Sequence, residues 1–270
     1  MPSLLPSQLF DQAVPVILIC LITLSFMVLE RIRPGRALPQ VPGWHLRAAL
    51  MNLMQLGLIG AGGLIWNRFF REHALFDLGA WSSPMLEGFF YWFVGTFIFY
   101  GWHRLRHAKG FWLIFHQIHH SPSRIEVLTS FYKHPVEIAA DSIIASFFIY
   151  FVFGGTALAG AWTSLFGAAG EYFYHANIRT PMWLGWFIQR PEHHSVHHQL
   201  GVHRYNFGDL TIWDRLFGTF KEAPRFAERC GFPGTAETRL PEMLAFRDVY
   251  DYDTADADSP TPYSGPKHTP

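Results

Sequence analysis

The sequence has little charge and almost no cysteine. Charged residues make up 16% of its 270 residues, and the formal net charge is zero, whereas soluble proteins carry about 25% charged residues. A neutral chain without a basic tract is not expected to bind nucleic acid. Cys20 and Cys230 are far apart and form no Cys-x-x-Cys motif, which excludes a disulfide framework and a cysteine-based metal or redox site.

Long uncharged segments predict helices that cross a membrane, since a spanning helix needs about 20 mostly apolar residues. The first three candidates are Gln12–Leu29, Ala48–Asn67 and Met85–Trp102, and the third is interrupted only by Glu87. The sequence therefore predicts an integral membrane protein.

A further uncharged stretch, residues 142–170, has Gly154 and Gly155 near its middle. We interpret it as part of a helical hairpin with arms Val136–Phe153 and Thr156–Tyr174, and a single long tilted helix is the alternative. Pro135 suits the first turn of the opening arm. The fold class expected is all-α, with about four to five membrane helices.

The basic residues predict the orientation, because cytoplasmic loops are enriched in Lys and Arg. With the N-terminus outside, Arg68 and Arg71 lie outside, and the other 19 of the 21 Lys and Arg residues (21 minus 2) lie inside. Residues 103–134 and those after Tyr174 then form a cytoplasmic, histidine-rich helical cap, and we expect a bacterial inner membrane. The polar tail after Asp248 is typical of disorder.

Histidine is the outlier in composition, with 15 copies, 12 of them between His103 and His203. Nine stand three or four positions apart or at a predicted helix end, so that their side chains would share one face of a helix. They form one HxxxH pair, two HxxHH groups and a single residue: His103, His107, His116, His119, His120, His175, His194, His197 and His198.

Such a cluster predicts a metal site. Nine crowded imidazoles would repel one another as cations, and as neutral groups they would need many hydrogen-bond partners, whereas neutral imidazole is a common metal ligand. Nine nitrogens exceed the coordination of one ion, so we expect two. Imidazole suits zinc, copper, iron and nickel alike. The chain has no HExxH motif, which a zinc protease would show. The chemistry that needs two metal ions at a membrane surface is oxygen activation against a lipid chain, and iron is the usual metal for it.

Residues Tyr100 to Phe220 resemble the fatty acid hydroxylase superfamily, also called the sterol desaturase family, of integral membrane non-haem di-iron enzymes. The resemblance rests on the three histidine motifs with Ser121-Pro122 and Pro191-Glu192-His193, and on Tyr132-Lys133-His134-Pro135-Val136-Glu137, His175-Ala176-Asn177, Asn206-Phe207-Gly208 and Trp213-Asp214-Arg215-Leu216-Phe217-Gly218-Thr219. It implies that the nine histidines bind two iron ions. Together with the apolar segments and the polar tail, the resemblance leads us to expect membrane helices in residues 1–90, a di-iron domain in 91–222 and a partly disordered cytoplasmic tail in 223–270.

The same resemblance implies a reaction, namely hydroxylation of a lipid C–H bond with O2, or desaturation as in C-5 sterol desaturases. Electrons would come from a separate ferredoxin-like or cytochrome-b5-like protein with its reductase. Two other classes are a histidine-rich metal transporter or sensor and a bis-histidine haem cytochrome. Nearly uncharged spans, with the histidines on one side, disfavour both.

One residue departs from the family pattern. Arg179 stands where some members have a second histidine four positions after the one matching His175, so His134, His193 or His203 are candidates for an extra ligand.

Several other residues are candidates for supporting roles. Glu171 is expected to orient His175, Asn206 is expected in a turn, and the Trp213–Arg215 segment is expected to be structural. The roles of Glu137 and Asp141 stay open. The remaining histidines are expected at the surface, namely His45, His73 and His268.

Overall fold

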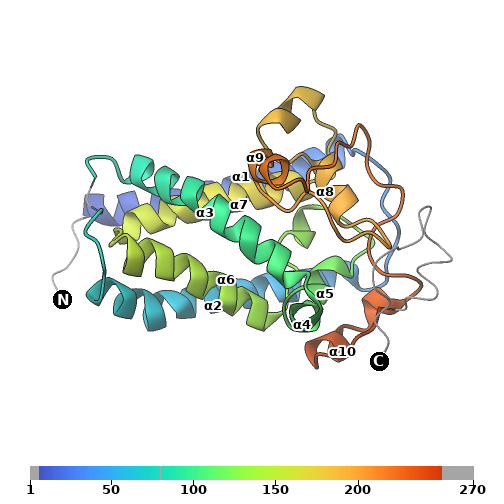
Figure 1. Ribbon diagram of the computed structural model, residues 1–270, viewed down its shortest axis with the longest axis horizontal. Helices are drawn as coiled ribbons and strands as arrows, with labels where there is room; N and C mark the ends of the chain where they lie inside the picture. The colour runs from blue at the N-terminus through green and yellow to red at the C-terminus, as the bar shows by residue number, and fades with distance from the viewer. Residues whose placement is uncertain (1–5, 80, 251–270) are drawn as a thin grey trace.

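The structure is a computed structural model that describes residues 6–79 and 81–250. Within these residues it contains helices and two isolated β-bridges but no strand, which confirms the all-α class. Five long helical segments lie side by side in a bundle, and shorter helices gather at one end of it (Figure 1). The long segments are α1 (Pro6–Ile32), α2 (Trp44–Glu72), α3 (Pro84–Arg106), α6 (Pro135–Ser146) with its π-helical continuation η3 (Phe147–Val152), and α7 (Ala157–His175).

The helix starts follow local sequence signals. Ser83 caps α3 by accepting a hydrogen bond from the Leu86 N–H, and Thr156 caps α7 by accepting one from the Ala159 N–H at 3.1 Å. Proline occupies the first turn of α3 and of α6, where its missing N–H costs no helical hydrogen bond. These caps fix where the helices that carry the candidate ligands begin.

The stretch between residues 135 and 175 is a helical hairpin, as predicted, and the alternative of one long helix is wrong. The chain turns at Gly154, whose φ is +67°, a conformation that glycine adopts without steric cost. A Cβ added at Gly154 would clash with the carbonyl oxygen of Phe76, so no other residue fits there.

The bundle has two layers. Helix α7 packs against both α1 and α3, while α6 and η3 pack against α2. Helices α3 and α7 approach closely at Gly88, where an added Cβ would lie 2.6 Å from the Ala159 carbonyl oxygen. The Thr163 hydroxyl donates to the Gly88 carbonyl oxygen at 3.1 Å. Helices α3 and α7 lie side by side, and both end beside the short helices (Figure 1).

Among the residues that the structure describes, three helical segments are long and apolar enough to cross a membrane: Ala13–Ile32, Trp44–Glu72 and Pro135–Val152. Many of their leucines are exposed, including Leu24, Leu56 and Leu64, as expected for a surface that faces lipid. The other two predicted spans fall in α3 and α7, which lie in the same bundle. The total number of crossings remains a prediction.

The cytoplasmic position of the expected cap remains a prediction, but short helices that include the histidine-rich segments do gather at one end of the bundle (Figure 1). They are α4 (Lys109–Phe111), η1 (Trp112–His116), α5 (Gln117–His120), η2 (Val127–Thr129), η4 (Met182–Trp186), α8 (Pro191–His197), α9 (Thr211–Leu216), η5 (Ala236–Thr238) and α10 (Leu240–Leu244). A core of Trp44, Tyr132, Phe232, Met243 and Val249 joins the C-terminal segment to the start of α2. The rest of the tail predicted to be disordered, residues 251–270, and His268 lie outside the described residues.

Candidate metal centre

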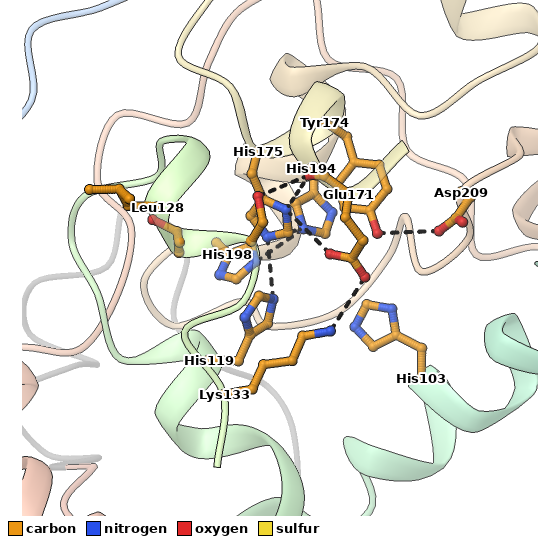
Figure 2. Close-up of polar contacts among 12 residues, drawn as sticks. His103, His119, Leu128, Lys133, Glu171, Tyr174, His175, His194, His198 and Asp209 are labelled. Carbon is orange, nitrogen blue, oxygen red and sulfur yellow. Dashed lines mark hydrogen bonds and ion pairs between the residues drawn. The ribbon is translucent and has the colours of Figure 1, made fainter. Parts of the chain in front are cut away.

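The nine histidines at ligand spacing lie together in two adjacent groups, each of which could hold a metal ion. We call them site A and site B. Within each group, one ring nitrogen from every histidine lies within 4.8 Å of the others. Site A comprises His103, His107, His116, His120 and His197, and site B comprises His119, His175, His194 and His198. Figure 2 shows the site B rings converging, with His103 of site A nearby.

Each HxxHH group contributes to both sites. His116 and His120, four positions apart, belong to site A, while His119 between them turns to site B. The second group is reversed: His194 and His198 belong to site B, and His197 turns to site A. The prediction of a single helical stripe for residues 116, 119 and 120 is therefore wrong. Positions i and i+4 differ by about 40° around a helix, but i+3 and i+4 differ by about 100°, so two neighbouring sites can divide them.

The backbone is irregular where the first HxxHH group begins. Residues 112–116 form a π-helical turn that ends at His116, and α5 follows directly. A π-helical turn is wider than an α-helical one and is frequent at functional sites. It lets His116 reach the ends of α3 and α8 from a helical segment of only a few residues.

In site A, the nitrogens that face away from the ligand cluster have partners. His103 Nδ1 contacts the Phe207 carbonyl oxygen at 2.7 Å, and His197 Nδ1 contacts the Tyr205 carbonyl oxygen at 2.7 Å. His116 Nδ1 contacts Glu137 Oε1 at 2.8 Å. Because an oxygen acceptor fixes the proton on Nδ1, the Nε2 lone pair of each ring is free for a metal.

A strained loop supplies most of these acceptors. His203, Tyr205 and Asn206 all have positive φ, at 41°, 69° and 50°, which is costly for residues other than glycine. In this conformation the loop directs the carbonyls of Phe207 and Tyr205 to His103 and His197 of site A. The strain is thus located where it orients two of the histidines.

Two side chains hold this loop in place. Asn206 Nδ2 donates to the carbonyl oxygens of His193 and Lys221, and Asn206 Oδ1 accepts from the Lys221 N–H at 2.8 Å. The Asp214 carboxylate accepts the N–H groups of Phe207 and Gly208 at 2.9 and 2.8 Å. Asn206 therefore lies in a turn, as expected, and the structural role expected for Asp214 is to fix the loop beside site A.

Site B is held differently. Its Nε2 atoms lie against one another, with His175 Nε2 3.1 Å from His194 Nε2 and 3.3 Å from His119 Nε2. His198 Nε2 lies 3.1 Å from His194 Nε2. His175 Nδ1 contacts the Glu171 carbonyl oxygen at 2.9 Å, with the Glu171 carboxylate at 3.6 Å. Among the described residues the other three Nδ1 atoms of site B have no hydrogen-bond partner.

A chain of charged side chains connects the two sites on the side of the long helices. Glu137 pairs with Arg106 as well as with His116. Arg106 and Lys133 each approach Asp141, at 3.6 and 3.5 Å, and Lys133 reaches Glu171 at 3.3 Å (Figure 2). Glu137 and Asp141, whose roles the sequence left open, both belong to this series of charged side chains. Its carboxylates bring negative charge close to ligands that are themselves neutral.

Burial keeps the candidate ligands of both sites uncharged. It lowers the pKa of His197 to about 3. Burial, followed by repulsion from neighbouring histidines, lowers the pKa values of His120 and His198 well below the ordinary histidine range. An uncharged imidazole is the form that binds a metal ion.

The donor set fits metal ions. All five Nε2 atoms of site A are buried and without a hydrogen-bond partner among the described residues, and unpartnered buried nitrogens cost free energy unless something binds them. Two nitrogens about 2.1 Å from one ion lie roughly 3.0–3.4 Å apart. The Nε2 separations in site B, 3.1–3.3 Å, fall in that range.

The proposed extra ligands lie outside both groups. His134 caps α6 by accepting the Val136 N–H at 3.1 Å, and His193 Nε2 pairs with Glu222 at 2.7 Å. His203 Nδ1 lies 3.1 Å from His120 Nδ1, behind a site A ligand. Arg179 is exposed beyond the end of α7, and its Nε donates to the Gly35 carbonyl oxygen. His45 and His73 are exposed, as expected.

Comparison with known proteins identifies the histidine-bearing part of the chain. The family model "Fatty acid hydroxylase" matches residues 88–219, which include all nine histidines. No solved structure matches significantly.

Curated relatives are similar over parts of the chain. Alkylglycerol monooxygenase of Xenopus tropicalis is 29% identical over 170 residues, 58% of this chain and 34% of that protein. Sphinganine C4-monooxygenase 2 of Arabidopsis thaliana is 30% identical over 135 residues, 44% of this chain and 48% of that protein. Methylsterol monooxygenase 2-1 of the same plant is 35% identical over 71 residues, 26% of each chain. The chain thus spans about a third of the alkylglycerol monooxygenase, and these relatives are named for oxidation of different lipids.

Proposed function

Because the chain belongs to the fatty acid hydroxylase superfamily, we propose that it is a membrane-bound di-iron oxygenase that hydroxylates a lipid C–H bond with O2. The observation that carries this proposal is the division of nine histidines, eight of them buried and His107 half-buried, into two adjacent groups of ligand-like geometry. Residues 91–222 would form the di-iron domain. Desaturation of the lipid is the alternative outcome, which the ligand set does not distinguish.

The proposal assigns the iron ligands by site. One iron would be held by His103, His107, His116, His120 and His197, and the other by His119, His175, His194 and His198. When bound, iron supplies the activation of O2 that an unactivated C–H bond requires. The chain keeps these imidazoles neutral by burial, and Glu137 and the loop carbonyls of Tyr205 and Phe207 hold the protons on Nδ1.

The location of the sites supports a lipid substrate. Both sites lie at the end of a bundle whose outer surface is covered with exposed leucines and phenylalanines. A lipid could approach from the bilayer without entering water. Burial of the ligands excludes water from the metals, which favours oxidation of the substrate over side reactions.

The proposed reaction also needs an electron donor that can reach the two sites from one side of the membrane. We propose a separate electron donor, either a ferredoxin-like or a cytochrome-b5-like protein with its reductase. The distribution of Lys and Arg supports a cytoplasmic position for the sites, where such donors are found. We propose a bacterial inner membrane as the location.

Lipid analysis tests the proposal. The chain is expressed in a host with a redox donor, and total lipid extracts are compared by mass spectrometry with those from cells expressing His198→Ala. We expect a lipid class that gains one oxygen atom with the wild type only. A loss of two hydrogen atoms instead would identify a desaturase. Identical extracts from an iron-loaded, reducible wild type and from the variant, across donors of both types, would contradict the proposal.

A further inference from the structure

The cap exposes a group of large apolar side chains on one flank. We call it the apolar flank, and it consists of residues of η4 and α9 with the positions that follow them: Met182, Trp183, Trp186, Phe187, Ile212, Leu216 and Phe217. Their exposed fractions lie between 46% and 68%. An aromatic cluster this exposed is unusual for a surface in water.

The two parts of the apolar flank form one unit. The Thr211 N–H donates to the Phe187 carbonyl oxygen at 3.2 Å, beside a β-bridge between Ile188 and Leu210. The Arg215 guanidinium lies over the Trp186 ring at 4.7 Å and donates to the Gly185 carbonyl oxygen at 3.1 Å. Helices η4 and α9 are therefore fixed to each other. Helix α8, with ligands of both sites, lies between them in sequence.

The apolar flank continues the outer surface of the helical bundle. Trp213, on α9, donates from Nε1 to the Thr96 hydroxyl at 2.9 Å, and its ring lies 5.0 Å from that of Phe97. Phe97 is itself exposed and also stacks on Phe217 at 6.2 Å. Helix α9 thus packs beside α3, as Figure 1 shows.

The contact with α3 gives the depth of α9. Thr96 lies seven residues before His103 on α3, and a helix rises 1.5 Å per residue, so Thr96 is about 10 Å nearer the middle of the bundle than the first site A ligand. Helix α9 therefore lies alongside the bundle at the level of its exposed phenylalanines, and not beyond the end of α3.

We propose that η4 and α9 lie in the interfacial layer of the bilayer, with the apolar flank in contact with acyl chains. Short amphipathic segments bind membranes in this way, and tryptophan concentrates at the interface. The contact of α9 with α3 favours lipid over a soluble protein partner. To cover α9, such a partner would have to reach past the histidines towards the middle of the helical bundle. Because α8 joins the two elements, the bilayer contact and the ligands of both sites belong to one connected segment. This proposal does not depend on the metal or on the reaction.

Spin labels in the full-length protein, reconstituted in phospholipid nanodiscs, test the proposal. Single cysteines replace Leu216, Trp186 and, as a second α9 position, Ile212, all in a Cys20→Ala background; Cys230 is buried. The measurement compares collision of each label with O2, which concentrates in the bilayer, and with a water-soluble nickel chelate. Leu56→Cys, exposed on α2, serves as the lipid-facing control, and Glu228→Cys, exposed on the cap, as the water-facing control.

We expect the labels at 186, 212 and 216 to favour O2, with a positive logarithm of the collision ratio like that at 56, and the label at 228 to favour nickel. Labels at 186, 212 and 216 that behave like the one at 228 would overturn the proposal and leave the surface free for a soluble partner. Labels protected from both reagents would also overturn it, since a protein, such as a second copy of the chain, would then cover the surface.

Discussion

Site A and site B are built from the same residue type and are neighbours, but the protein fixes them to different degrees. Site A has five histidines, and the Nδ1 atoms of at least three are held by oxygen acceptors from Glu137, Tyr205 and Phe207. Site B has four histidines, and among the described contacts only His175 is held in this way, by Glu171. Site A therefore has a more rigid ligand set, whereas site B leaves more of an ion's coordination open. The ligands of one site cannot be treated as equivalent to those of the other.

Removal of one ligand from each site is expected to have the largest effect. His194→Ala leaves site B with three imidazoles, and we expect the metal content to fall from two ions per chain towards one. His107→Ala leaves site A with four, the number that site B has naturally, so two ions should remain. Both variants should lose lipid oxidation by at least about 10²-fold, because even loss of a group that orients a ligand costs about 10–100-fold.

Metal analysis by mass spectrometry and product formation are measured on the same preparations, with exposed His45→Ala as the control. If His107→Ala loses an ion while His194→Ala keeps two, the predicted difference between site A and site B would be contradicted.

Removal of the orienting carboxylates should give a smaller but unequal effect. Glu137→Ala deletes the Nδ1 acceptor of His116 and leaves Arg106 with only the more distant Asp141, so we expect metal affinity at site A to fall about 10–100-fold. Glu171→Ala should change affinity at site B much less, because the backbone carbonyl, and not the carboxylate, is the nearer acceptor for His175.

A chelator titration measures both affinities, and Glu137→Gln is the matched control because it keeps an oxygen acceptor. Equal losses in the two alanine variants would contradict the different anchoring of the sites.

The loop beside site A should respond next. Asn206→Ala removes three side-chain hydrogen bonds from a fully buried position, which costs about 1–3 kcal/mol when partners remain unsatisfied. We expect lower thermal stability and faster metal release from site A than from site B. Asn206→Gly separates the causes, since glycine tolerates the φ of +50° but makes no side-chain contacts. Uniform release from both sites would show that the loop does not act on site A specifically.

The smallest effect is expected at Arg179. Helix α7 ends at His175, so residue 179 is not one helical turn further along the same face. Arg179→His should therefore leave metal content and metal affinity unchanged, as should Arg179→Ala. A third bound ion, or tighter binding at site B in the histidine variant only, would show that position 179 reaches the site.

Much of the fold could be predicted from the sequence because apolar runs and turn residues act locally. The hairpin was predicted from the uncharged stretch around Gly154 and Gly155, and the structure confirms it. The spacing of nine histidines likewise predicted which residues lie together. The division of each HxxHH group between two sites could not be predicted, because it depends on how the short helices α5 and α8 face each other across the end of α3.

Other parts of the site have no signal in residue type. Backbone carbonyls of Tyr205 and Phe207 orient site A ligands, and any residue has such a carbonyl. The asparagine at 206 was a partial signal, since asparagine tolerates positive φ. Conversely, His134 and His193 have the residue type of a ligand but act as a helix cap and as a partner of Glu222.

The most direct test is the iron-to-chain ratio of the purified full-length protein, measured together with its absorption spectrum. Two separate histidine sites predict two irons per chain after loading under reducing conditions, without a haem band. Saturation at a single ion, or no tightly bound metal at all, would contradict the assignment of the nine histidines to two sites.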